Sequence, residues 1–136
     1  APQVYESFAI FILAPRPNPR YPDAPFMEPM VVINPEIVER SDAMVKGWEG
    51  CLSIPGIRGI VPRHQRILTR FQILDGTTVE REFTDFPSRV FQHEDDHLRG
   101  IMFLDRIEHA HDLFTEREYE EEAARAKQAA DSSPPR

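Results

Sequence analysis

The sequence has few cysteines and no long apolar run. Its single cysteine, Cys51, excludes a disulfide within the chain and fits a reducing compartment. No apolar stretch approaches the length of a membrane span, no internal repeat is evident and no signal peptide is visible. A formal net charge of −7 argues against a general affinity for nucleic acid or anionic membranes. We therefore expect no direct nucleic-acid binding and no membrane association.

The composition is that of a globular chain with one core. Of the 136 residues, 40% are hydrophobic and 29% are charged, which is ordinary for a soluble domain of this size. The charge pattern changes near the C-terminus, where glutamate, alanine and arginine dominate. We expect a globular domain over residues 1–111, followed by a charged helix and tail over residues 112–136.

The first two thirds of the chain predict antiparallel β structure. Short apolar and β-branched runs predict strands over residues 4–13, 30–33, 37–39, 58–74 and 78–83. Asn34-Pro35 breaks the second strand, and Asp75-Gly76 is a strong hairpin signal between the last two. Six prolines in residues 14–29 predict an extended surface loop.

Two helices are predicted in the last third. Asp85, Pro87 and Ser88 supply the chemistry of a helix start. The residues that then share one inward face at helical spacing are Val90, Phe91, Glu94, His97, Leu98 and Ile101. A capping box at Thr115 and Glu118 indicates a second helix within residues 112–130. Strands followed by helices predict an α+β fold, with antiparallel sheets packed around the first helix.

Two histidines on the first helix indicate a metal site. His93 and His97 are four residues apart, so they point the same way on a helix and can share one ion. Glu94 lies beside them as a candidate base, and its inward position is unfavourable unless a metal or a substrate water compensates. A tetrahedral catalytic metal needs three protein ligands and one open position for water. The third ligand is therefore missing from this motif.

The residues leave two sources for the third ligand. A metzincin would carry a third histidine at the position of Phe103, so this class is excluded. A gluzincin-type endopeptidase would take a glutamate from the second helix, which offers Glu116, Glu118 and Glu120 to Glu122. The other source is the thiolate of Cys51, although a lone cysteine is often a small buried hydrophobe. Sulfur and imidazole ligands together suit zinc or ferrous iron.

Two motifs resemble signatures of the peptide deformylase family. The segment Glu49-Gly50-Cys51-Leu52-Ser53 is similar to the family's EGCLS, and Gln92-His93-Glu94-Asp95-Asp96-His97-Leu98-Arg99-Gly100 is similar to its QHExDHLxG. The opening Ala1-Pro2-Gln3 resembles the end of a third motif, GxGLAAxQ. We expect the glycines of that motif and the family's N-terminal helix to be missing from this chain. The resemblance covers residues 1–108.

The resemblance implies a metal-dependent hydrolase that removes the N-formyl group from the N-terminal methionine of newly made polypeptides and releases formate. It implies three metal ligands, namely Cys51, His93 and His97. Glu94 would carry the proton from water to the leaving amine, while the Gln3 amide and the Leu52 backbone N–H would hold the oxyanion. The implied working ion is Fe²⁺, and Zn²⁺, Ni²⁺ or Co²⁺ is compatible with the same ligands.

Further residues take expected roles through the same resemblance. The implied contacts of the formyl-methionyl peptide are Arg58, Gly50 and Glu49, with the peptide extended beside residues 56–59. Gln92 and Asp96 are expected to support the metal ligands. Asp95, at the variable position of the motif, is expected to be exposed.

The sequence leaves open the type of protein, its association with the ribosome and its cellular location. The gluzincin endopeptidase is one alternative, and an inactive module that captures nascent peptide N-termini is another, although an intact Glu94 argues against it. The acidic composition of the C-terminal helix indicates a plain exposed helix rather than a segment that docks on the ribosome. The expected location is cytoplasmic in a bacterium, and a mitochondrion or plastid stays open because the front of the first motif is missing.

Overall fold

The described residues form two compact units built from separate segments of the chain. A computed structural model describes residues 9–17, 24–51 and 54–131. Unit 1 holds the described residues of Ala1–Val45 and Arg63–Met102, and unit 2 holds those of Lys46–Pro62 and Phe103–Arg136. This grouping by packing is distinct from the boundary expected after residue 111, which stays a prediction.

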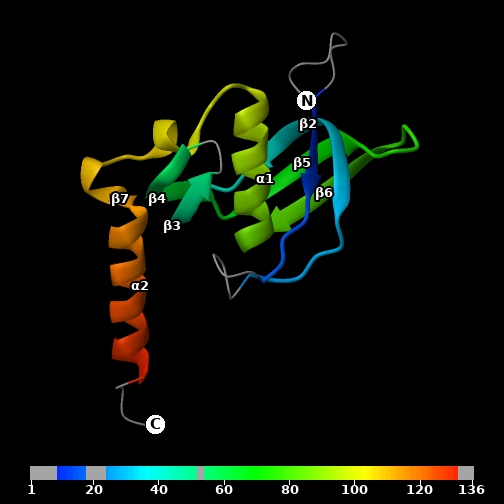
Figure 1. The fold of residues 1–136 in the computed structure, drawn as a ribbon. Helices are drawn as coiled ribbons and strands as arrows, with labels where there is room; N and C mark the ends of the chain where they lie inside the picture. Colours follow the sequence, from blue (N-terminus) through cyan, green and yellow to red (C-terminus); the bar gives the residue numbers. More distant parts are fainter. Residues whose placement is uncertain (1–8, 18–23, 52–53, 132–136) are drawn as a thin grey trace. The chain divides into compact units, whose positions relative to one another are not determined.

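Unit 1 is a four-stranded antiparallel sheet with one helix packed on it. The sheet order is β1-β2-β5-β6, formed by β1 (Ile10–Leu13), β2 (Met30–Arg40), β5 (Arg66–Gln72) and β6 (Thr78–Thr84). Helix α1 (Asp85–Leu98) contacts β1, β5 and β6, and it lies across the sheet in Figure 1. The expected α+β class with antiparallel strands is confirmed, and α1 carries the histidine motif.

The core of unit 1 is assembled around the ring of Phe91. The buried cluster consists of Phe11, Leu13, Val32, Ile67, Phe71, Phe83 and Phe91. The Phe91 ring meets Phe11 edge-on at 5.2 Å between centroids and stacks on Phe83 at 5.4 Å. In β5 the side chains of Ile67 and Phe71 lie on the buried face of the sheet, as alternation requires. Phe91 therefore joins α1 to three strands.

Asn34 lies where the sequence predicts a break within β2. Its φ of 50° lies in the left-handed region, which asparagine tolerates better than most residues. Its side-chain Oδ1 accepts the Ala9 N–H at 3.1 Å, and its own N–H donates to the Ala9 carbonyl at 2.8 Å. The pairing of β2 with β5 shifts register between Ile33 and Glu36. The strand continues through this irregularity as one element, Met30–Arg40, so the predicted break into two strands is wrong and Asn34 causes only a shift in register.

Unit 2 contains most of a second, three-stranded sheet of order β3-β4-β7. Its strands are β3 (Met44–Cys51), β4 (Ile54–His64) and β7 (Leu113–Thr115). The single extended segment expected over residues 58–74 is wrong, because a bend at Gln65 divides it into β4 and β5 of different sheets. The Gln65 N–H donates to the Ala43 carbonyl at 3.0 Å, outside either strand ladder.

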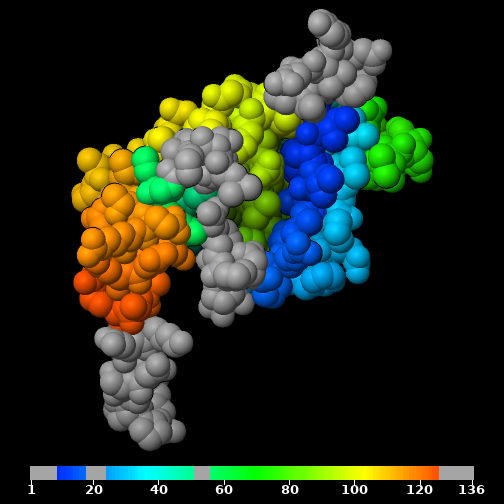
Figure 2. All heavy atoms as spheres, in the orientation of Figure 1, coloured from blue at the N-terminus to red at the C-terminus, as the bar shows by residue number. Residues whose placement is uncertain are grey.

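The second predicted helix begins later than the charge pattern indicates. Two 3₁₀ turns, Phe103–Arg106 and Ala110–Asp112, precede β7, and α2 spans Glu116–Asp131. The residues of β7 pair with residues 57–59 of β4, so they are part of a sheet and not of the helix. Figure 2 shows the orange side chains of α2 exposed on one face of unit 2. Within the described ranges, no helix is both long and apolar enough to cross a membrane.

Replacing Phe91 by alanine tests the core of unit 1. We expect Phe91→Ala to lower the free energy of unfolding by about 3–5 kcal/mol, because it removes a fully buried ring from a packed cluster. Urea unfolding followed by circular dichroism measures the change. Leu74→Ala is the control, since this side chain is 79% exposed and its loss should change stability little. Equal effects of the two substitutions would contradict the assigned core.

Candidate functional site

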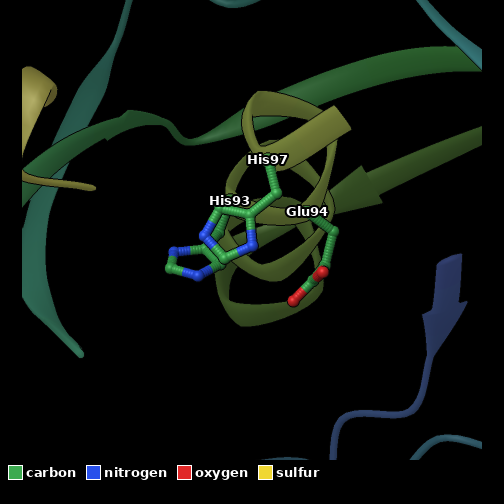
Figure 3. A group of neighbouring side chains, drawn as sticks. All are labelled: His93, Glu94 and His97. Atoms are coloured by element: carbon green, nitrogen blue, oxygen red, sulfur yellow. The ribbon is translucent and has the colours of Figure 1, made fainter. Parts of the chain in front are cut away.

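His93, Glu94 and His97 converge on one side of α1. Their potential ligand atoms all lie within 4.8 Å of one another. The imidazole centroids are 4.4 Å apart with planes inclined by 54°, and Figure 3 shows the Glu94 carboxylate on the same side of the helix as both rings. The predicted placement of two histidines on one helical face is confirmed. Among the described residues, this is the one group of three side chains that could hold a metal ion.

The surroundings of His97 favour its neutral form. Burial lowers the pKa of His97 below its usual value of 6.5, and the neighbouring His93 lowers it further. Glu94 and Asp96 raise this pKa, but their effect is the smaller one. A neutral imidazole has the free lone pair that a metal requires. The fold therefore keeps His97 ready for ligation to a lower pH than an exposed histidine.

A buried polar stripe fixes the orientation of α1. Ser88, Gln92 and Asp96 follow at intervals of four residues and are all buried. The Gln92 amide accepts the His64 N–H at 2.9 Å and donates to the His64 carbonyl at 2.8 Å, and Ser88 Oγ donates to the same carbonyl at 2.9 Å. Asp96 forms a buried ion pair with Arg63. These bonds tie one side of α1 to the last two residues of β4.

The stripe sets the direction of the metal-binding side chains. His93 and His97 each follow one residue after a member of the stripe, so the rotation of α1 that satisfies Gln92 and Asp96 also orients both imidazoles. Gln92 contacts the backbone of His64, and Asp96 contacts the side chain of Arg63. The expectation that both residues support the metal ligands stays a prediction.

Asp95 is buried, so the expectation that it is exposed is wrong. Only 4% of the residue is accessible, and its Oδ2 accepts a hydrogen bond from Arg99 Nε at 3.2 Å. Burial raises the pKa of Asp95, and the opposing pull of Arg99 is the smaller effect. The reason for the error is that α1 is buried along a polar side as well as along the Phe91 side. Hydrophobic periodicity does not detect such a side.

The glycine of the histidine motif ends the helix. Gly100 has a φ of 77°, a conformation that glycine adopts without strain. Its N–H donates to the His97 carbonyl at 3.1 Å, and the Ile101 N–H donates to the Asp96 carbonyl at 2.9 Å. This pair of bonds is a Schellman motif, which satisfies the last carbonyls of a helix. The chain therefore leaves α1 within one turn of His97.

The remaining predicted site residues lie in unit 2 or outside the described part. Cys51 is the last residue of β3, but its side chain lies outside the described side chains. Gln3 and Leu52 also lie outside the described residues. Gly50 is in β3, and Glu49 of the same strand is buried. The roles assigned to these residues stay predictions.

The glutamates that the gluzincin reading requires are partly engaged elsewhere. Glu116 pairs with the buried Arg58, whose Nε lies 3.0 and 3.2 Å from the two carboxylate oxygens. Glu118 accepts the Thr115 N–H at 3.0 Å, while its own N–H donates to Thr115 Oγ1 at 3.1 Å. This reciprocal pair confirms the predicted capping box. These two carboxylates thus serve α2 and unit 2 itself.

Sequence reasoning missed Arg63 as a supporting residue. Its side chain is buried and pairs with Asp96, the last member of the polar stripe. The signal was present in β4, where Gly59, Val61 and Arg63 alternate on the buried side of the strand. An arginine on the buried side of a strand needs a buried acid, and Asp96 is that acid.

The family model and the curated relatives that this chain resembles are all deformylases. The polypeptide deformylase family matches residues 1–112. Peptide deformylase 2 of a Nostoc species is 54% identical over 121 residues, covering 89% of this chain and 68% of the relative. Peptide deformylase 2 of Shewanella oneidensis is 57% identical over 106 residues, covering 78% and 59%. The chain thus spans about three fifths to two thirds of the length of these curated relatives.

Solved structures give the same assignment. A class I type b peptide deformylase from Acinetobacter baumannii with bound Met-Ala-Ser is 52% identical, with a TM-score of 0.71, over 72% of this chain and 62% of that one. Peptide deformylase from Thermotoga maritima is 44% identical, with a TM-score of 0.58, over 60% and 55%. A family match over most of the chain, close relatives and a shared fold agree. The chain belongs to the polypeptide deformylase family.

Proposed function

We propose that this chain hydrolyses the N-formyl group from the N-terminal methionine of newly made polypeptides and releases formate. The observation that carries the proposal is the convergence of His93, Glu94 and His97 on α1 in a chain of this family. The relative with bound Met-Ala-Ser, a methionine-initiated peptide, supports the substrate class.

The donor set of α1 fits a divalent metal ion. Two imidazoles on one helical face, one of them kept neutral by burial, are borderline ligands that suit Fe²⁺, Zn²⁺, Ni²⁺ or Co²⁺. We take the Cys51 thiolate as the third ligand and Fe²⁺ as the native ion, on the strength of the EGCLS and QHExDHLxG motifs. When bound, such an ion lowers the pKa of water toward neutrality and polarises a carbonyl oxygen.

Glu94 carries the proton in the proposed reaction. A Glu94 carboxylate oxygen takes a proton from the attacking water and delivers it to the amine nitrogen as the C–N bond of the formamide breaks. One water is consumed, and formate and a free amino terminus are produced. The side-chain amide of Gln3 and the backbone N–H of Leu52 hold the oxyanion.

The peptide contacts and the cellular setting complete the proposal. The peptide is bound by unit 2 through Arg58, Gly50 and Glu49. Ribosome docking by α2 is the weaker of two readings, because the described side chains of the helix suit a plain exposed helix. Cytoplasmic location in a bacterium, or a mitochondrial or plastid location, stays a prediction.

Substituting Glu94 separates an enzyme from a binding module. We expect Glu94→Gln to reduce formate release from formyl-Met-Ala-Ser by about 10²–10⁴-fold, because it removes the general base while preserving the side-chain shape. Glu120→Gln, an exposed charge on α2, is the control and should retain turnover. A wild-type chain that binds the peptide without releasing formate would instead support the binding module.

Metal content identifies the third ligand. We expect about one divalent ion per chain after anaerobic purification, and loss of that ion in both His93→Ala and Cys51→Ala, since each removes one of three ligands. Atomic emission on the purified protein measures the content. Met44→Ala, which removes a half-exposed sulfur from the same strand as Cys51, should keep the metal. Metal retained in Cys51→Ala would revive the glutamate ligand.

The stability of the metal-free chain should depend on His97. Its pKa is lowered in the folded state, so the unfolded chain binds the proton more strongly and stability falls as the pH drops below about 6.5. We expect His97→Asn to flatten this part of the pH profile measured by urea unfolding. Leu74→Ala, at an exposed position without a titratable group, should leave the profile as it is in the wild type. An unchanged slope in His97→Asn would contradict the assigned shift.

A further inference from the structure

Arg58 is a buried cation held from two sides by α2. The residue is 3% exposed, and its Nε lies 3.0 and 3.2 Å from the carboxylate oxygens of Glu116. The guanidinium carbon lies 4.2 Å from the ring centroid of Tyr119, which is a cation–π contact. A charge and a ring from the same helix therefore fix both the position and the plane of the guanidinium.

The start of α2 makes this arrangement rigid. The capping box of Thr115 and Glu118 begins the helix at Glu116, so Glu116 and Tyr119 lie three residues apart on one face. The Tyr119 ring packs edge-on against Trp48 at 4.9 Å between centroids, and Trp48 in turn packs against Phe114 at 4.8 Å. Of the two residues that hold Arg58, Tyr119 is thus itself held by an aromatic cluster.

One end of the guanidinium has no partner. Arg58 Nη1 is buried and makes no hydrogen bond, because both oxygens of Glu116 lie against Nε. A buried donor without an acceptor is unfavourable, so this atom is satisfied only when a further oxygen reaches it. Glu116 already neutralises the charge of Arg58, and a second carboxylate there would meet Glu116 as a like charge. A neutral carbonyl oxygen meets no such repulsion.

We propose that Glu116 is a specificity-determining residue, which with Tyr119 positions Arg58 to donate a hydrogen bond to a neutral main-chain carbonyl of the peptide and to disfavour a carboxylate. The inference rests on the proposed function, since it takes the peptide as the ligand of Arg58. The first turn of α2 thereby discriminates between two kinds of peptide. A chain that continues past Arg58 presents a carbonyl there, whereas a chain that ends there presents a carboxylate. Arg58 contacts the peptide, and Glu116 and Tyr119 act by positioning Arg58.

The test compares free-acid and amidated peptides of two lengths. Formate release is measured for formyl-Met-Ala and formyl-Met-Ala-Ser, each as acid and as amide, over a range of concentrations. We expect the wild type to favour the amide in KM by about tenfold at the length whose terminus reaches Arg58. Glu116→Gln keeps an acceptor for Nε but removes the charge, so the acid-to-amide ratio should fall close to one at that length.

Three controls separate specificity from stability. Glu120→Gln removes a charge from an exposed position of the same helix and should preserve the wild-type ratio. Tyr119→Phe keeps the ring and should preserve it too, whereas Tyr119→Leu should raise KM for both forms. In an Arg58→Ala background, Glu116→Gln should change the ratio no further, because its effect passes through Arg58. A merely structural role would alter all peptides equally and leave the ratio constant.

The outcomes for the inference and for the proposed function are distinct. A ratio of one in the wild type, or equal shifts in Glu116→Gln and Glu120→Gln, overturns the specificity role while formate release stands. If the wild type releases no formate, the proposed function fails. The inference is then tested by binding. The dissociation constants of Met-Ala-Ser and its amide are measured through the fluorescence of the single tryptophan, Trp48, and their ratio takes the place of the KM ratio.

Discussion

The site on α1 depends on the hydrogen bonds between its polar stripe and the end of β4. Ser88 and Gln92 satisfy the backbone of His64, and Asp96 meets Arg63 in a buried ion pair. A helix packed only by apolar side chains can rotate slightly with little change in energy. Directional bonds to a fixed backbone remove that freedom, since a small rotation leaves buried polar groups unpaired. The four-residue spacing of His93 and His97 brings their imidazoles together, and the polar stripe fixes the rotation of α1 that orients them.

Local chemistry was predictable from sequence, and non-local pairing was not. The histidine spacing and the capping box of Thr115 and Glu118 each follow from a few neighbouring residues, and the structure confirms both. The division at Gln65 and the strand before α2 depend on partners far along the chain, such as the pairing of Arg58 with Phe114. The burial of Asp95 was missed because this side of α1 is polar, so hydrophobic periodicity gives no sign that it is buried.

Unit 2 repeats the same use of a buried arginine with a different outcome. In unit 1, Arg63 and Asp96 form a buried pair that serves the structure. In unit 2, Arg58 meets a half-exposed Glu116 and a tyrosine ring, and one of its nitrogen atoms stays unsatisfied. Arginine suits both tasks because its planar group donates in several fixed directions and stacks on aromatic rings. The difference is that Arg58 keeps one N–H group, at Nη1, without an acceptor in the described part of the protein.

Strand β4 carries both arginines, and this has a consequence for the evolution of the chain. Arg58 and Arg63 are five residues apart, so the two-residue repeat of a strand sends their side chains to opposite faces. One inserted or deleted residue between them would turn one arginine to the wrong face and leave its acid unpaired. A change of length between residues 58 and 63 thus breaks one ion pair or the other. The length of this stretch should therefore be constant among relatives that keep both arginines.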